Sequence, residues 1–141
     1  MELDGYRARL GLRGARLIRY AWAAPWTVLA GALTPLVRLS GGRARVVAGV
    51  LELEGGFLPA VLRRLPPGGV AAITIGHVVL GRDERVLDQT RAHERAHVEQ
   101  FERWGPLFPL VYGLASLAAW GRGGDYYRDN RFEVEARRQE G

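Results

Sequence analysis

The sequence predicts an α+β domain in which a small β-sheet packs on one long polar helix, with further helices after it. Two runs rich in β-branched residues, 46–53 and 70–81, are typical of strands, and glycines mark their ends. The charged segment 81–105 carries apolar residues at helical spacing and ends at Gly105-Pro106, as an amphipathic helix does. These strands and this helix together favour the α+β class.

The composition limits the chemistry that the chain can perform. Its 141 residues suffice for one small domain, which we expect over 46–141, preceded by a basic arm and a hydrophobic helix over 1–45. The sequence contains no cysteine, which excludes disulfides and thiolate metal sites, so histidine and carboxylate side chains must hold any transition metal. The net charge of +5 is carried by arginine alone, and it permits contact with anionic partners without requiring it.

The segment before the first strand contains a long uncharged run. Residues 20–37, "YAWAAPWTVLAGALTPLV", are eighteen in number and follow five arginines. A helix of this length is about long enough to cross the hydrocarbon core of a bilayer, so we predict an uncleaved membrane anchor. The alternative is a buried helical hairpin, which Pro25, Pro35 and the threonines of the run favour.

Other segments predict shorter helices. "FLPAVLRRL", residues 57–65, is a short helix candidate that the following Pro-Pro-Gly-Gly ends. A second apolar helix is expected over 107–120, and one short helix closes the chain.

The long helix carries the motif H-E-x-x-H at His93, Glu94 and His97. At about 100° per residue, all three fall on the arc that also holds Val98 and Phe101, so they face inward. Polar groups on a buried face cost free energy unless they are paired, and one metal ion would pair both imidazoles. The spacing of four places both rings one turn apart, with Glu94 beside them as a base.

A catalytic zinc site requires a third protein ligand, and two residues are candidates. Glu133, on the last helix, would complete a His2Glu set, although Asn130-x-x-Glu133 also has the form of a capping box. Glu135 points about 160° away from Glu133 on the same helix and cannot share the role. His77, in the middle of the second strand run, is an alternative ligand, a hydrogen-bond donor to the substrate, or a packed core histidine.

If Glu133 is a metal ligand, the second uncharged run, 104–121, cannot cross a membrane. If this run crossed a membrane, Glu133 and the two histidines of the motif would lie on opposite sides. We therefore expect a core helix or a helix in the membrane interface.

Three stretches together resemble a known family. "HERAHVEQFERWGPLF", "YRDNRFEVEA" and "ITIGHVVLGRD" are similar to small bacterial H-E-x-x-H metallopeptidases of the gluzincin type, over 70–137. The piece "EVEA" also resembles the third-ligand helix of membrane metallopeptidases related to the CAAX-prenyl protease and the HtpX heat-shock protease. The resemblance implies a minimal zincin-like fold, bound Zn²⁺ and Glu133 as ligand. That pattern continues to an aspartate where this chain has Arg137, and Asp129 is the candidate replacement.

These patterns predict a zinc metallopeptidase that hydrolyses peptide bonds by a metal-activated water, with Glu94 as general base. Tyr127 is the first candidate donor to the developing oxyanion, followed by His77 and Tyr126. The substrate would be a peptide or protein, which strand 71–80 could bind as an added strand. The resemblance and the run 20–37 together imply a bacterial, membrane-associated protein, or a cytoplasmic one if that run is buried.

Two other functions are considered. One is a non-catalytic, metal-binding structural or interaction protein associated with a membrane, in which Glu94 would be dispensable. The other is an arginine-rich nucleic-acid-binding protein. The sequence disfavours nucleic acid as a partner because the arginines are dispersed and partly paired with acids.

Overall fold

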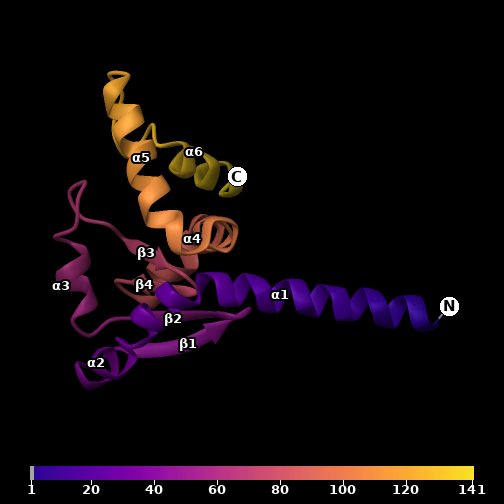
Figure 1. Ribbon diagram of the computed structural model, residues 1–141. Helices are drawn as coiled ribbons and strands as arrows, with labels where there is room; N and C mark the ends of the chain where they lie inside the picture. The colour runs from indigo at the N-terminus through magenta and orange to yellow at the C-terminus, as the bar shows by residue number, and fades with distance from the viewer. Residues whose placement is uncertain (1) are drawn as a thin grey trace.

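The computed structural model describes the backbone of residues 2–141 and the side chains from Gly11 onward, Leu12 excepted. It confirms the α+β class, with one four-stranded sheet and several helices (Figure 1). In chain order, the elements are α1 (Glu2–Gly31), α2 (Thr34–Leu39), β1 (Arg43–Val47), β2 (Val50–Glu54), α3 (Leu58–Leu62), β3 (Ala72–Ile75), β4 (Val78–Gly81), α4 (Glu84–Trp104), the 3₁₀ helix η1 (Gly105–Leu107), α5 (Phe108–Gly121) and α6 (Arg131–Gln139).

The sheet is built from two hairpins and has the strand order β1-β2-β4-β3. Within each hairpin the strands are antiparallel, and β2 and β4 join the hairpins as a parallel pair. The prediction of two continuous strands was therefore wrong. Ala48 and Gly49 have φ of 47° and 79°, as the two-residue turn of a tight hairpin needs. Gly76, with φ of 64°, opens the second turn, and a Cβ there would come within 2.4 Å of the Thr27 hydroxyl.

Helices cover both faces of the sheet. Below it, Leu53, Val78 and Leu80 pack with Leu58 and Leu62 of α3 in one buried cluster. Above it, α4 packs its own apolar side chains on the sheet in a second cluster, made of Val50, Val79, Leu87 and Val98. The third cluster joins α1, α4, α5 and α6 through Ala23, Phe101, Phe108 and Phe132. The sheet and the last two helices therefore hold α4 between them.

The N-terminal segment differs from the prediction. Residues 20–37 do not form one hydrophobic helix, because α1 ends at Gly31 and α2 starts at Thr34. Ala30 and Val37 are buried in the cluster below the sheet, whereas Val28, Leu29 and Leu36 of the same run are exposed. Among the described residues, no helix is both long enough and apolar enough to span a membrane. The predicted basic arm starts at Met1, which lies outside the described residues.

The long polar helix is confirmed as α4, and the local sequence explains both of its ends. Asp83 caps the N-terminus, since its carboxylate accepts a hydrogen bond of 2.8 Å from the backbone N–H of Val86. Gly105 ends the helix with φ of 57°. A Cβ on Gly105 would lie 2.2 Å from the indole nitrogen of Trp22, so the glycine also lets α1 pack closely.

Candidate metal centre

The helix α4 presents the two histidines of the motif to one point. His93 and His97 lie one turn apart, and their Nε2 atoms are 3.1 Å from each other. His97 is 8% exposed, and the rings meet edge to face. Two imidazole nitrogens so close in a buried place can be satisfied by one shared cation.

Glu133 of α6 brings a carboxylate to the same point. Its Oε2 lies 3.1 Å from Nε2 of His93, and its Oε1 lies 3.3 Å from Nε2 of His97. One ligand atom from each of the three residues lies within 4.8 Å of the other two. Glu133 is 2% exposed, and its Oε2 has no hydrogen-bond partner among the described residues. A buried, unpartnered carboxylate oxygen facing two imidazoles fits a metal cation.

The structure also shows how the start of α6 is capped. Asn130 accepts a hydrogen bond of 2.9 Å from the backbone N–H of Phe132, while its own backbone N–H donates to the carbonyl of Tyr127. The carboxylate of Glu133 therefore does not close the capping box. Its Oε1 accepts instead a 2.7 Å hydrogen bond from the hydroxyl of Tyr112 on α5. Of its two predicted roles, the geometry of Glu133 agrees with that of a ligand.

The charges of this cluster support one another. Burial alone would raise the pKa of Glu133, but the imidazoles of His93 and His97, whose Nε2 atoms lie 3.1 and 3.3 Å from its oxygens, hold that pKa well below its ordinary value. Burial likewise opposes protonation of the histidines, yet the nearby carboxylate of Glu133 raises the pKa of both. The pocket thus favours a negative Glu133 with positive charge beside it, whether protons or a metal ion carry that charge.

Glu94 lies in the same pocket without belonging to the ligand cluster. It is 6% exposed, and its Oε2 accepts a 2.6 Å hydrogen bond from the hydroxyl of Thr74 on β3. Burial raises the pKa of this carboxyl group. A carboxylate with a raised pKa binds a proton more readily than an ordinary glutamate, which suits it to take up a proton beside a metal position.

Gln100 positions the second histidine, and sequence reasoning missed it. Its side-chain oxygen lies 2.8 Å from Nδ1 of His97, and its amide nitrogen donates to the carbonyl of Phe132. Because that carbonyl can only accept, the amide oxygen must face the imidazole. His97 then carries its proton on Nδ1 and leaves Nε2 for a metal. The only sequence signal for this role is the i,i+3 spacing of His97 and Gln100.

The expected aspartate partner is not Asp129. Its carboxylate accepts from the backbone N–H of Asp125, in the turn before α6. Arg137 donates to the carbonyl of Arg128, and Nδ1 of His93 lies 2.6 Å from a carboxylate oxygen of Glu140. Glu140 therefore takes the place near His93 where a supporting carboxylate is expected.

A cavity of about 380 Å³ surrounds the cluster. Tyr126 and Tyr127, the candidate oxyanion donors, line it together with Tyr112 and Thr74. Burial and the charge of Glu133 raise the pKa of Tyr127 to about 12, so its hydroxyl keeps its proton at neutral pH. Ala72, Ile73 and Thr74 bring the edge strand β3 to the cavity wall.

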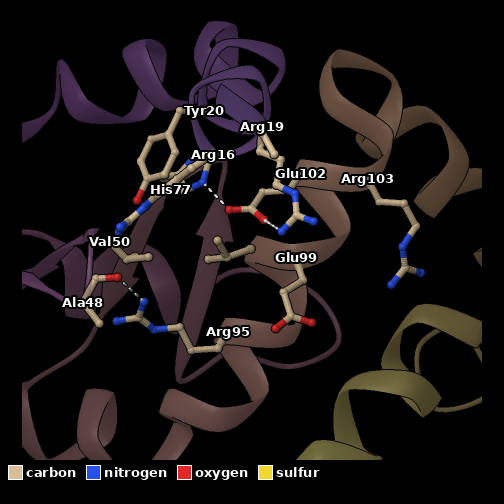
Figure 2. Close-up of a pocket in the computed structure, with 12 residues that line it drawn as sticks. Arg16, Arg19, Tyr20, Ala48, Val50, His77, Arg95, Glu99, Glu102 and Arg103 are labelled. Carbon is tan, nitrogen blue, oxygen red and sulfur yellow. Dashed lines mark hydrogen bonds and ion pairs between the residues drawn. The ribbon is translucent and has the colours of Figure 1, made fainter. Parts of the chain in front are cut away.

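The structure corrects the prediction for His77. It lies in the turn between β3 and β4 rather than within a strand, and its Nε2 is 2.8 Å from a carboxylate oxygen of Glu102. Its ring stacks on Tyr20 with 3.9 Å between the ring centroids (Figure 2). Its backbone N–H donates to the hydroxyl of Thr27. His77 lines a separate cavity of about 710 Å³ on another face of α4. It is thus neither a third ligand nor a donor in the pocket around Glu133.

Glu135 points away from the cluster, as expected, and pairs with Arg103 at 3.0 Å.

Comparisons with protein-family models, with curated proteins and with solved structures find no match for this chain. The resemblance to H-E-x-x-H metallopeptidases therefore depends on the quoted motifs alone.

Proposed function

We propose that the chain is a zinc-dependent metallopeptidase with a minimal zincin-like fold, in which His93, His97 and Glu133 hold the metal. The observation that carries this proposal is the buried Oε2 of Glu133, which lies 3.1 Å from Nε2 of His93 and has no hydrogen-bond partner in the part of the chain that the structure describes. Two imidazoles and a carboxylate on a buried face cost free energy unless they are paired, and one metal ion would pair all three. The carboxylate of Glu94, which lines the same cavity without belonging to the cluster, supports a catalytic site over a purely structural one.

The ligand set favours zinc. Two imidazole nitrogens and one carboxylate are the protein ligands of a common class of catalytic zinc site, and they leave one position open. Zinc bound there would polarise a substrate carbonyl and make a water molecule more acidic near neutral pH.

Glu94 would act as the general base. Its raised pKa lets its carboxylate accept a proton from the attacking water and then pass that proton to the leaving amine. The hydrogen bond from Thr74 fixes one carboxylate oxygen, which leaves the other to face the water. Thr74 is therefore a positioning residue.

Tyr127 is the candidate donor to the oxyanion that forms as the carbonyl is attacked. Its hydroxyl stays protonated at neutral pH, since the pKa is raised to about 12. The hydroxyl of Tyr112 is engaged with Glu133, and Tyr126 is 43% exposed at the rim.

The substrate would be an extended peptide lying along β3. This strand pairs with β4 on one side only, and its residues 72–74 line the cavity. A peptide added to the free edge would gain backbone hydrogen bonds and pass beside Glu94.

The test is a peptidase assay on an unfolded protein such as reduced casein, with the zinc-loaded chain. Glu94→Gln is expected to bind zinc as the wild type does and to lose at least about 100-fold in kcat/KM. Glu99→Gln is the matched control, because Glu99 lies on the same helix and is exposed. Equal activity of wild type and Glu94→Gln would reject the peptidase and favour a structural metal site.

A further inference from the structure

The outer side of α5 is apolar and exposed. The helix and the residues before it carry no charge from Trp104 to Gly121. Leu107, the last residue of η1, and the outward side chains of α5 form what we call the α5 face. They are 52–70% exposed: Leu107, Leu110, Leu114, Leu117 and Trp120. The opposite side of the same helix buries Phe108 and Ala119. The exposed side is as apolar as the buried one. A helix with one side in water ordinarily carries polar side chains on that side.

The second half of α1 shows the same pattern. Its outward side chains, which we call the α1 face, are 46–71% exposed: Leu17, Ile18, Trp22, Val28 and Leu29. Ala23 and Ala30, on the opposite side of the helix, are buried in the core. Packing within the chain therefore leaves both faces uncovered.

The two helices that carry these faces meet at η1. Trp22 of the α1 face packs against Gly105, and the indole of Trp26 donates to the carbonyl of Pro106 at 3.1 Å. Leu107, the first residue of the α5 face, follows directly. Soluble monomers seldom expose apolar patches larger than a few hundred Å², and larger ones mark interaction sites.

Arginines frame both apolar runs. Arg19 and Arg38 stand on either side of 20–37, and Arg103 and Arg122 stand on either side of 104–121. All four arginines are exposed, although Arg19 also lies 3.8 Å from Glu102. Neither run contains an acidic residue. This distribution complements a surface that is apolar inside and negatively charged at its rim, as an anionic lipid layer is.

A second copy of the chain fits this charge pattern less well. If two α5 faces packed on each other, the arginines at their ends would meet apolar side chains or other arginines, because the runs supply no acid to pair with them. Trp22 and Trp120, exposed on the two faces, are also the residue type favoured at membrane interfaces.

We propose that the α1 and α5 faces dock this chain on the surface of an anionic membrane, with both helices lying in the interface. Pro109 and Ser116 of α5 also line the cavity around Glu133, so docking would place that cavity beside the lipid surface. Resting on the proposed function, the substrate class would then be peptide segments that lie at or near the membrane.

The test is sedimentation of the full chain with vesicles of phosphatidylcholine, alone or mixed with phosphatidylglycerol. Binding to the mixed vesicles is expected, together with a blue shift of tryptophan emission. The triple variant Leu110→Gln, Leu114→Gln and Leu117→Gln should bind at least about tenfold more weakly. Val61→Gln, an exposed apolar residue on α3, is the matched control and should bind as the wild type does.

Two further measurements make the result decisive. Circular dichroism of the triple variant checks that it folds. The variant Arg122→Gln tests the charge contribution separately, and it should bind the mixed vesicles more weakly than the wild type does. A wild type that ignores anionic vesicles would overturn the proposal. The proposal would also be overturned if the wild type bound no vesicles and light scattering showed a dimer that the triple variant abolishes. Glu94→Gln should bind vesicles normally, which separates this proposal from the catalytic one.

Discussion

Gln100 and His97 lie one turn apart on α4, and the amide oxygen of Gln100 is 2.8 Å from Nδ1 of His97. The amide nitrogen of Gln100 donates to the carbonyl of Phe132 on α6. One fully buried side chain therefore orients the imidazole of His97 and ties α4 to the helix that carries Glu133. This amide is one of the links between the two helices, together with the ion pair of Arg103 and Glu135.

This relationship predicts the effect of Gln100→Leu. The substitution keeps the size of the side chain but removes the acceptor for Nδ1 of His97, so the ring loses its fixed tautomer and orientation. Zinc affinity should fall about 10- to 100-fold, measured by competition with a chromophoric chelator. Gln89→Leu, at an exposed position of the same helix, should bind zinc as the wild type does. Equal affinities of the two variants would contradict the positioning role.

Thr74 is expected to act on catalysis through Glu94. Thr74→Val removes the 2.6 Å hydrogen bond while preserving the shape of the side chain. The kcat for peptide hydrolysis should fall about tenfold or more, with zinc affinity and KM nearly unchanged. Thr74→Ser should restore most of the rate, because serine keeps the hydroxyl. A loss that serine does not restore would point to packing instead.

The stabilisation that zinc gives should grow with pH. In the metal-free chain, the raised pKa values of His93 and His97 add stability that is complete below about 6.5 and is lost as pH rises through the folded values. The lowered pKa of Glu133 adds stability above about 4.5, which is lost as pH falls. Zinc needs deprotonated imidazoles, so it competes with protons for the same nitrogens.

The measurement is the rise in Tm on adding zinc, at about pH 5.5 and about pH 8. The rise should be larger at the higher pH, and it should vanish at both in His93→Ala. A rise that is equal at the two pH values would mean that zinc binds elsewhere.

Glu52 is expected to contribute strongly to stability. It is 2% exposed in β2, and its carboxylate oxygens accept from Arg45 at 2.9 Å and from Arg91 of α4 at 3.0 Å. Glu52→Ala leaves both guanidinium groups without this partner and should lower the free energy of unfolding by roughly 3 kcal/mol. Urea denaturation checks this, with Glu54→Ala, at the end of the same strand, as the milder control. A change below about 0.5 kcal/mol would show that solvent replaces the carboxylate.

The sequence predicted the meeting of His93, His97 and Glu133 better than it predicted the sheet. Helical spacing alone places His93 and His97 together, and the geometry of Glu133 agrees with the ligand set inferred from the chain. The hairpins were missed because Gly49 and Gly76 reverse the chain inside runs that look continuous by composition. His77 follows Gly76 in the second of these turns. It therefore does not lie on the strand face where the alternation of side chains had placed it.

Other features required the tertiary structure. Tyr112 and Thr74 reach the pocket from α5 and β3, and no local spacing links either of them to the motif on α4. The uncharged run 20–37 looked like one spanning helix, because hydropathy does not register the break between Gly31 and Thr34. Composition also does not show which side of a helix stays exposed, and the membrane-docking proposal depends on that property.

The most direct test of the central claim is the zinc content of the purified chain, measured by mass spectrometry after incubation with zinc and dialysis. We predict about one zinc per wild-type chain, as one three-residue ligand set requires, with the metal lost in Glu133→Ala and retained in Glu135→Ala and His77→Ala. Zinc retained in Glu133→Ala, or absent from the wild type, would contradict the account.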